Sequence, residues 1–163
     1  MDIGTTIQMI NLRLNSIFLD KVCRPTEFKK PTENLRLVHH LLELMRREHG
    51  IGLAANQAGI DQRLFVMLIN SELYSCFNPE ILSSSDEHCD LIEGCLSFPD
   101  QRLSITRPTT IQVRYFNAHG RMTETELTGL SARCFQHELD HLNGITMHQR
   151  IGKLDGQKLF VGS

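Results

Sequence analysis

The sequence QHELDHLNG (residues 136–144) places two histidines, His137 and His141, four positions apart in a helical pattern that ends at Asn143 and Gly144. Residues four apart lie on one face of a helix, about 6 Å from each other along its axis, so both imidazoles can bind one cation. In this HExxH pattern, the glutamate after the first histidine serves as the base toward water. The stretch therefore predicts a metal-binding helix with Glu138 as the base; a solvated helix face is the alternative.

The segments before this helix predict the layers that surround it. Leucine, valine and methionine at spacings of three and four predict an earlier helix at 33–48, with Thr32 as its N-cap. Short runs of apolar and β-forming residues predict strands at 63–69, 73–77, 102–107, 110–116 and 121–127. Asn78 and Pro79 are expected to close the second of these strands. This order predicts a single α+β domain, 1–163, with antiparallel sheets packed around a central helix that carries HELDH.

Composition and charge narrow the class of protein. The 163 residues are 40% apolar and 22% charged with a formal net charge of -2, which is typical of a globular domain without a polyanion-binding surface. The longest apolar run, 64–69, is far shorter than the roughly 20 residues that span a bilayer, and no signal-peptide pattern is visible. Five cysteines without a CxxC pair indicate a reducing compartment. We expect a cytoplasmic protein with neither a membrane nor a nucleic-acid partner.

The third metal ligand distinguishes the possible classes of metal enzyme, because a catalytic site normally has three protein ligands and one open position. The peptidase pattern HExxHxxGxxH would place that ligand at Met147, and His148 comes one residue too late. After His141 the only acidic residue is Asp155, so we expect the third ligand upstream. The other histidines have no ligand spacing and are expected to be ordinary polar residues: His39, His40, His49, His88, His119 and His148.

Two upstream segments carry residues suited to such a site. EGCLS (93–97) contains Cys95 directly after a glycine that allows close approach of the backbone, with a buried structural thiol as the alternative interpretation. GIGLAANQ (50–57) is a run of small residues that ends in Gln57, whose side-chain amide can donate a hydrogen bond. Its alternative interpretation is a glycine turn that leads into the next strand, and it lacks the spacing of a phosphate-binding loop.

Together, GIGLAANQ, EGCLS and HELDH resemble the hallmarks of the peptide deformylase family in their order and form, and the likeness extends from about residue 36 to residue 141. The resemblance implies an enzyme that removes the N-formyl group from the N-terminal formyl-methionine of nascent polypeptides and releases formate. It implies that Cys95, His137 and His141 bind one divalent metal ion, with water in the fourth place.

The resemblance also assigns roles around that ion. Glu138 would take the proton of the water and later deliver it to the leaving amine. The side-chain amide of Gln57 and the backbone N–H of Leu96 would hold the developing oxyanion. Glu93 is expected to brace the site from behind a ligand, as ligand-orienting partners do.

The substrate would pair as an added strand with the glycine segment and with the stretch after EGCLS, which nominates Ile51, Gly52 and Arg102. The residues that the resemblance implies around the methionine side chain are Ile51, Leu91, Leu130, Arg133, Cys134 and the apolar part of His137. Arg133 departs from the family pattern, in which an aliphatic residue is commoner at this position.

The metal of the family is typically Fe(II), and Zn(II), Ni(II) or Co(II) can replace it, because one thiolate and two imidazoles suit all four ions. The expected partners are N-formylmethionyl peptides, as nascent chains at the ribosome, and the expected state is a monomer in a bacterial or phage-infected cell. The sequence ends 22 residues after His141, so we expect a truncated form of the family. Two alternatives are another HExxH metallohydrolase, such as a peptidase, and an inactive scaffold that keeps its metal.

Overall fold

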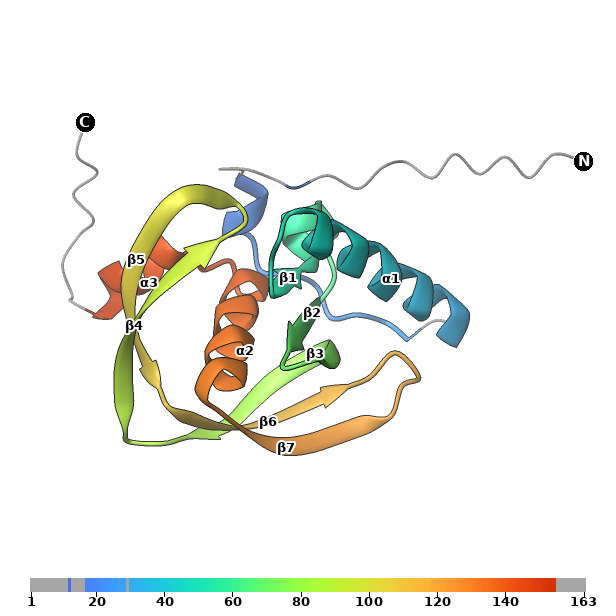
Figure 1. The fold of residues 1–163 in the computed structure, drawn as a ribbon. Helices are drawn as coiled ribbons and strands as arrows, with labels where there is room; N and C mark the ends of the chain where they lie inside the picture. Colours follow the sequence, from blue (N-terminus) through green and yellow to red (C-terminus); the bar gives the residue numbers. More distant parts are fainter. Residues whose placement is uncertain (1–11, 13–16, 29, 155–163) are drawn as a thin grey trace, which may run out of the picture.

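The computed structural model describes residues 12, 17–28 and 30–154 (Figure 1). Its elements, in chain order, are η1 (Ile17–Asp20), α1 (Pro31–Arg47), β1 (Gly52–Ala54), η2 (Ala55–Ala58), β2 (Leu64–Ile69), β3 (Glu72–Ser84), β4 (His88–Cys95), β5 (Phe98–Pro108), β6 (Thr110–Phe116), β7 (Met122–Thr128), α2 (Gly129–Leu142) and α3 (Met147–Leu154). Five strands form one antiparallel sheet in the order β1-β2-β3-β6-β7, and β4 and β5 form a separate hairpin. In the described residues, no helix has the length and apolar character needed to cross a membrane.

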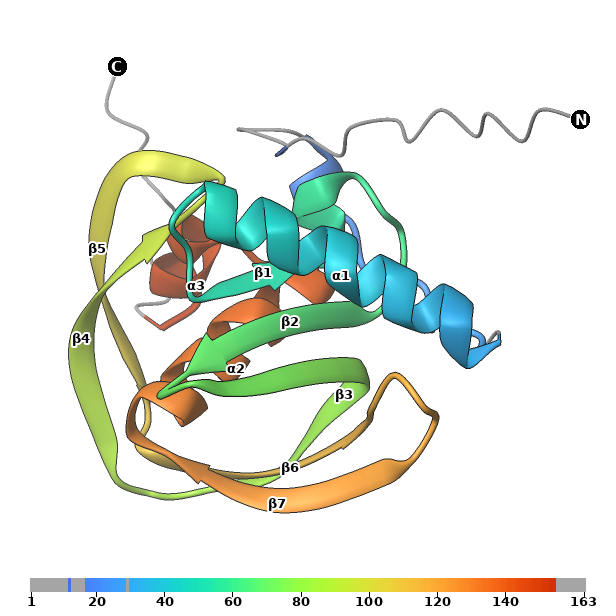
Figure 2. The same ribbon diagram turned by 45° about the vertical axis from the view of Figure 1, so that its right-hand side comes forward.

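Strand β2 is apolar along its whole length because helices cover both faces of the sheet there. Leu64 and Val66 pack in one core cluster with residues of α1, whereas Phe65 and Met67 pack in the other with residues of α2. Side chains of a strand alternate between its two faces, so a continuous apolar run fits a strand that is buried on both sides. Figure 2 shows α1 crossing in front of β2 with α2 behind the sheet.

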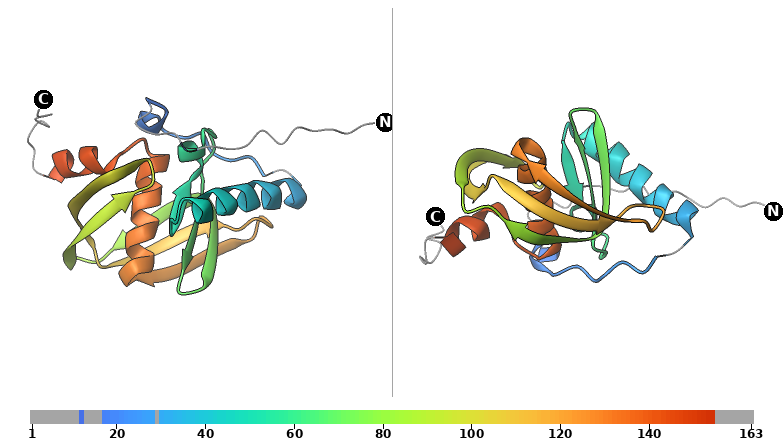
Figure 3. Two further views of the ribbon diagram at one scale, coloured as in Figure 1. Left: turned by 45° about the horizontal axis from the view of Figure 1, so that its top comes forward. Right: turned by 90° about the horizontal axis from the view of Figure 1, so that it is seen from below.

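Helix α2 lies between the large sheet and the β4–β5 hairpin, as Figures 1 and 3 show from different sides. Its buried face contributes Phe135 and Leu142 to the core, and Phe65 of the sheet meets Phe135 edge-on at 5.0 Å between ring centroids. The predicted class is therefore confirmed: antiparallel sheets pack around a central helix that carries HELDH. The helix ends at Leu142 with Asn143 as its C-cap residue, and the expected stop signal Gly144 follows, where φ is +67° and an added Cβ would lie 2.7 Å from the carbonyl oxygen of Asp20.

Strand β3 continues through Asn78 and Pro79, where the sequence predicted its end. Asn78 has φ +48°, and the register with β6 shifts between Phe77 and Glu80, so the two residues form a bulge inside the strand. The Asn78 side chain accepts a hydrogen bond from Thr26 N–H at 2.7 Å and donates one to Thr26 O at 3.0 Å. The predicted turn is wrong because this long-range clamp stabilises the irregular residue within the strand.

Five elements have no counterpart in the predictions, namely β1, β4, α3 and the short 3-10 helices η1 and η2. Most side chains of β4 are exposed or half-buried, so the strand lacks the apolar alternation by which strands are recognised. Helix α3 has only 8 residues, one of which is Gly152. The first helix begins at Pro31 with Lys30 as its N-cap residue, and not after Thr32, because proline fits the first helical position. The tail on which the expected truncation rests, 155–163, lies outside the described residues.

Candidate metal centre and active site

One thiol and two imidazoles converge at the middle of α2. The Nε2 atoms of His137 and His141 lie 3.2 Å apart, and Cys95 Sγ lies 3.2 Å from His141 Nε2. The three ligand atoms all lie within 4.8 Å of one another. Atoms that bind one zinc-like ion tetrahedrally, at roughly 2.0–2.3 Å from it, are themselves about 3–4 Å apart. The donor set and its spacing therefore fit a single divalent cation.

The protonation of the two histidines also bears on metal binding. Burial, together with the positive charges of His137 and Arg107, holds the pKa of His141 well below its usual range, so this imidazole is neutral. Burial lowers the pKa of His137 too, but hydrogen bonding with Cys95 and Glu93 outweighs it and raises that pKa to about 10. A metal binds neutral imidazole and thiolate, so a cation competes with protons for this site.

Glu93 holds the first histidine from behind. Its Oε2 accepts a hydrogen bond from His137 Nδ1 at 2.9 Å, which leaves Nε2 free to face a cation. Burial raises the pKa of Glu93, but hydrogen bonds from His137 and Arg107 more than offset this effect and hold it well below its usual range. The side chain is therefore a carboxylate, and it has the bracing position that the sequence predicted.

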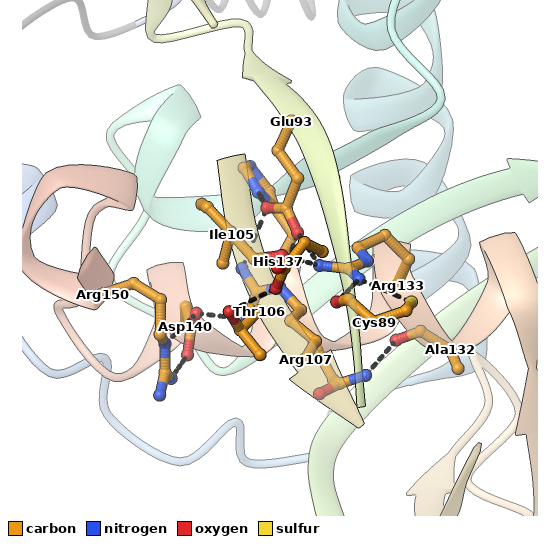
Figure 4. Close-up of polar contacts among 12 residues, drawn as sticks. Cys89, Glu93, Ile105, Thr106, Arg107, Ala132, Arg133, His137, Asp140 and Arg150 are labelled. Carbon is orange, nitrogen blue, oxygen red and sulfur yellow. Dashed lines mark hydrogen bonds and ion pairs between the residues drawn. The ribbon is translucent and has the colours of Figure 1, made fainter. Parts of the chain in front are cut away.

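Arginines connect Glu93 to a second buried carboxylate, Asp140 (Figure 4). Arg107 of β5 donates from Nε and Nη2 to Glu93 at 2.6 and 3.0 Å, and from Nη1 to Asp140 at 2.8 Å. Arg150 of α3 also binds Asp140 through both of its oxygens, with 2.9 Å from Nε to Oδ2. Through Asp140, these bonds connect α2 to the hairpin and to α3. This role explains the acidic residue at position 140.

Glu138, next to the first histidine, is buried beside the trio. Burial raises its pKa to about 7, and its Oε2 has no hydrogen-bond partner among the described residues. Its other oxygen, Oε1, would lie only 2.4 Å from a Cβ added to Gly52, which shows how closely β1 approaches the carboxylate. A buried carboxyl group that titrates near neutral pH beside a cation site is suited to proton transfer.

Gln57 is held with its amide nitrogen toward the trio. Its Oε1 accepts a hydrogen bond from Ala54 N–H at 2.9 Å, and its Nε2 lies 3.1 Å from Ser97 Oγ and 3.6 Å from Cys95 Sγ. Leu96 lies in the two-residue turn between β4 and β5, directly after Cys95. This crowding explains the glycine at position 50, because a Cβ added there would lie 2.5 Å from the Leu96 side chain.

A cavity of about 490 Å³ opens beside the trio. Its walls include most of the residues predicted to lie around the substrate: Ile51, Gly52, Gln57, Leu96, Arg102, Leu130, Arg133 and Cys134. Leu91 is not among the described residues that line it; the side chain is half-exposed on β4, and its neighbour Ile92 lines the cavity instead. Its walls also include side chains for which the sequence predicted no part in the site, namely Glu48, His49, Ile92 and Pro99.

Comparison with known sequences and structures places these features in one family. The sequence model of a family described as polypeptide deformylase matches residues 10–157. This chain belongs to the peptide deformylase family. A peptide deformylase of Thermotoga neapolitana is 47% identical over 116 residues, which are 71% of each sequence. The crystal structure of the Thermotoga maritima peptide deformylase is 42% identical, with a TM-score of 0.82 over 87% of this chain and 97% of that one. A structure from Acinetobacter baumannii, a class I type b peptide deformylase with Met-Ala-Ser bound, is 30% identical, with a TM-score of 0.82 over 87% and 98% of the two chains.

A peptide deformylase is a metal-dependent hydrolase that removes the N-formyl group from nascent polypeptides, and this is the activity of the present chain. The relatives favour deformylation over the peptidase and the inactive scaffold that the sequence left as alternatives. The deformylase carries a possible site for the divalent metal of the family in the Cys95, His137 and His141 cluster.

Proposed function

We propose that Cys95, His137 and His141 bind the catalytic metal ion of this deformylase and that Glu138 transfers the protons of the reaction. The observation that carries the proposal is the convergence of the three ligand atoms beside a buried carboxylate oxygen without a partner in the described chain. A bound divalent cation supplies Lewis acidity, which polarises the formyl carbonyl and lowers the pKa of a water molecule. The donor set accommodates Fe(II), which we propose as the native ion, and also Zn(II), Ni(II) and Co(II).

Glu138 carries the proton from the water to the leaving group. With a pKa near 7, the carboxylate accepts a proton as the water oxygen attacks the formyl carbon. It returns this proton to the amine nitrogen as the C–N bond breaks, which yields formate and a peptide with a free N-terminus. A carboxyl group with an ordinary, lower pKa would be a weaker base toward water.

Gln57 and the backbone N–H of Leu96 stabilise the negative charge that develops on the formyl oxygen. The Gln57 amide is suited to this role because the hydrogen bond from Ala54 to its oxygen fixes its orientation and leaves the NH₂ group toward the cavity. Donors that are oriented before the reaction stabilise a transition state without reorganisation at the moment of attack.

We expect Gln57→Ala to lower kcat by roughly 10²–10³-fold, the usual effect of removing one oxyanion donor. KM should change little, because the amide acts mainly on the transition state, and the midpoint of thermal unfolding should fall moderately, because Ala54 N–H and Ser97 Oγ lose a buried hydrogen-bond partner. Steady-state formate release and a thermal melt measure both effects. Gln57→Glu is the matched variant, since it keeps the size of the side chain and replaces the donor with an acceptor. A kcat within a few fold of wild type in both variants would remove Gln57 from the mechanism.

Gly52→Ala tests the placement of Glu138. The added Cβ would lie 2.4 Å from Glu138 Oε1 and 2.7 Å from Cys134 Sγ, so the carboxylate must shift. We expect kcat to fall by about 10²-fold, as displacements near 1 Å do in other active sites. Gly120→Ala is the control, because that glycine has φ +74° and only Phe28 near its Cβ position, so the change strains the fold away from the cavity. Equal kcat values for the two variants would contradict the close contact of β1 with Glu138.

The substrate is proposed to lie along β1, whose outer edge pairs with no described strand. A peptide added there would contact Ile51 and Gly52, and Arg102 of β5 also lines the cavity. Leu130, Arg133 and Cys134 form the wall toward which the methionine side chain would extend. The bound Met-Ala-Ser of the Acinetobacter enzyme supports a peptide of this kind as the ligand. A contact of Leu91 with the substrate stays a prediction.

Formate release from formyl-Met-Ala-Ser, measured after reconstitution with Fe(II), Zn(II), Ni(II) or Co(II) in turn, tests the function and the metal together. We expect formate to be released with several ions and most rapidly with Fe(II). Met-Ala-Ser and an unformylated longer peptide are the control substrates. Cleavage of an internal peptide bond without formate would indicate a peptidase, and metal binding without any turnover would indicate a scaffold.

We also propose that the enzyme is a monomer of one catalytic domain and acts on nascent chains in the cytoplasm of a bacterial or phage-infected cell. The family membership and the formal net charge of -2, which gives no reason to expect a nucleic-acid surface, support this setting.

A further inference from the structure

Arg133 is a buried cation in the wall of the cavity, and its guanidinium joins α2 to both strands of the hairpin (Figure 4). Nη1 donates to Glu93 Oε1 at 2.9 Å and to Ile105 O at 2.7 Å. Nη2 donates to Cys89 O at 2.8 Å and lies 3.2 Å from Cys89 Sγ. Only 6% of the residue is exposed, so its charge is paired inside the protein and is not offered to solvent.

These contacts give Glu93 a second arginine. Oε1 of Glu93 accepts hydrogen bonds from Arg107 Nε and Arg133 Nη1, while Oε2 accepts them from Arg107 Nη2 and His137 Nδ1. Arg107 approaches from β5 and Arg133 from α2, so the carboxylate is held from two different elements. A carboxylate with four oriented donors has one orientation, and that orientation directs Oε2 at the imidazole.

The same guanidinium fixes the hairpin that carries Cys95. Ile105 lies on β5 and Cys89 on β4, and Arg133 binds the backbone carbonyl of each. These bonds tie the two-stranded sheet to the helix that carries His137 and His141. Arg133 therefore contacts Glu93, which holds His137, and also both strands of the hairpin that carries Cys95.

We propose that Arg133 is a positioning residue for the metal ligand His137, acting through Glu93, and not only a part of the substrate wall. The inference rests on the proposed function, because it takes His137 as a ligand. Loss of the guanidinium would remove one of the two donors to Glu93 Oε1 and both bonds to the hairpin carbonyls. Glu93 would then be held toward Nδ1 less firmly and the hairpin would be less fixed, so the ligand set would bind a cation more weakly.

Arg133→Met separates the two roles, since methionine keeps an unbranched stem in the cavity wall and removes the charged group. We expect the affinity of the full chain for Zn(II), measured by competition with a chromogenic chelator, to fall about tenfold or more, as loss of a ligand-orienting partner does. With the variant saturated with Zn(II), any change in KM for formyl-Met-Ala-Ser should be smaller than the loss of Zn(II) affinity. Arg133→Lys keeps the charge and one donor nitrogen and should recover part of the affinity.

A double-mutant cycle tests whether the effect passes through Glu93. In a Glu93→Gln background, Arg133→Met should weaken Zn(II) binding clearly less than it does in the wild-type chain. Arg114→Met is the control, because it removes exposed ion pairs with Glu80 and Glu124, neither of which contacts a ligand, and should leave Zn(II) affinity unchanged.

Two results would overturn the positioning role. The first is unchanged Zn(II) affinity with a raised KM, which would return Arg133 to the substrate wall alone. The second is an equal loss in both backgrounds, and Arg133→Lys gives the same comparison if the methionine variant does not fold. Failure of the proposed function has a different signature, because the wild-type chain itself would then bind no Zn(II) at its cysteine and histidines.

Discussion

Glu138→Ala is expected to lose nearly all formate release, roughly 10²–10⁴-fold in kcat, while the protein keeps its metal. The carboxylate is not one of the three converging ligands, so its removal leaves the donor set intact. It is the buried group with a pKa near neutrality that can exchange a proton with water and amine. Steady-state kinetics with formyl-Met-Ala-Ser, together with elemental analysis of the purified variant, measure activity and metal content on the same sample.

Two further variants test whether the loss of activity comes from the missing base. Glu138→Gln keeps the shape of the side chain and removes its basicity, so it should be as inactive as the alanine variant. Glu124→Ala removes an exposed carboxylate of β7 that pairs with Arg114, and its activity should equal that of wild type. Undiminished turnover in Glu138→Ala would rule out this residue as the base, and loss of its metal would place it among the ligands.

Cys95→Ala is expected to lose the metal, and all activity with it. A site reduced to two imidazoles lacks the thiolate, the one anionic ligand, and structural and catalytic sites normally have three or four protein ligands. Elemental analysis after dialysis should give a metal-to-protein ratio near zero, whereas the wild-type ratio should approach one. This loss should be larger than that in any variant of the surrounding arginines, because those side chains act only through a ligand.

Cys76→Ala provides the matched control for that experiment. Cys76 is fully buried in the core, and burial raises the pKa of its thiol well above the usual range, so it is a neutral packing group. Its replacement makes the same chemical change as Cys95→Ala and should cost stability without affecting metal content. Full occupancy in Cys95→Ala, or equal loss in both variants, would show that the third ligand is assigned to the wrong cysteine.

The sequence was most informative where function depends on local spacing. His137 and His141 are one helical turn apart, so their common face follows from the helix alone, and the three short motifs fix the family. The contact of Cys95 with these histidines is not local, and it rested on the resemblance. The structure supports that expectation with a separation of 3.2 Å between Cys95 Sγ and His141 Nε2.

The supporting contacts were beyond the sequence, because they depend on the pairing of distant strands. Arg107 reaches both Glu93 and Asp140 only because β5 runs beside β4 and against α2. Strand β4 was missed since it has no apolar alternation, and the bulge at Asn78 was mistaken for a turn because the clamp from Thr26 is 52 positions away in the chain. Arg133 was expected only in the substrate wall, since no local pattern indicates that its guanidinium reaches Glu93.

The three ligands come from the β4–β5 hairpin and from α2, so a bound metal would also stabilise the fold. Cys95 belongs to the β4–β5 hairpin, and both histidines belong to the helix packed on the large sheet. A bound ion therefore adds a further link between two parts of the fold that the connecting backbone and the arginine hydrogen bonds already join. An ion that binds only the folded chain adds its binding free energy to the free energy of unfolding. A chelator would therefore lower the free energy of unfolding of this enzyme as well as inhibit it, so the midpoint of thermal unfolding would depend on the concentration of free metal.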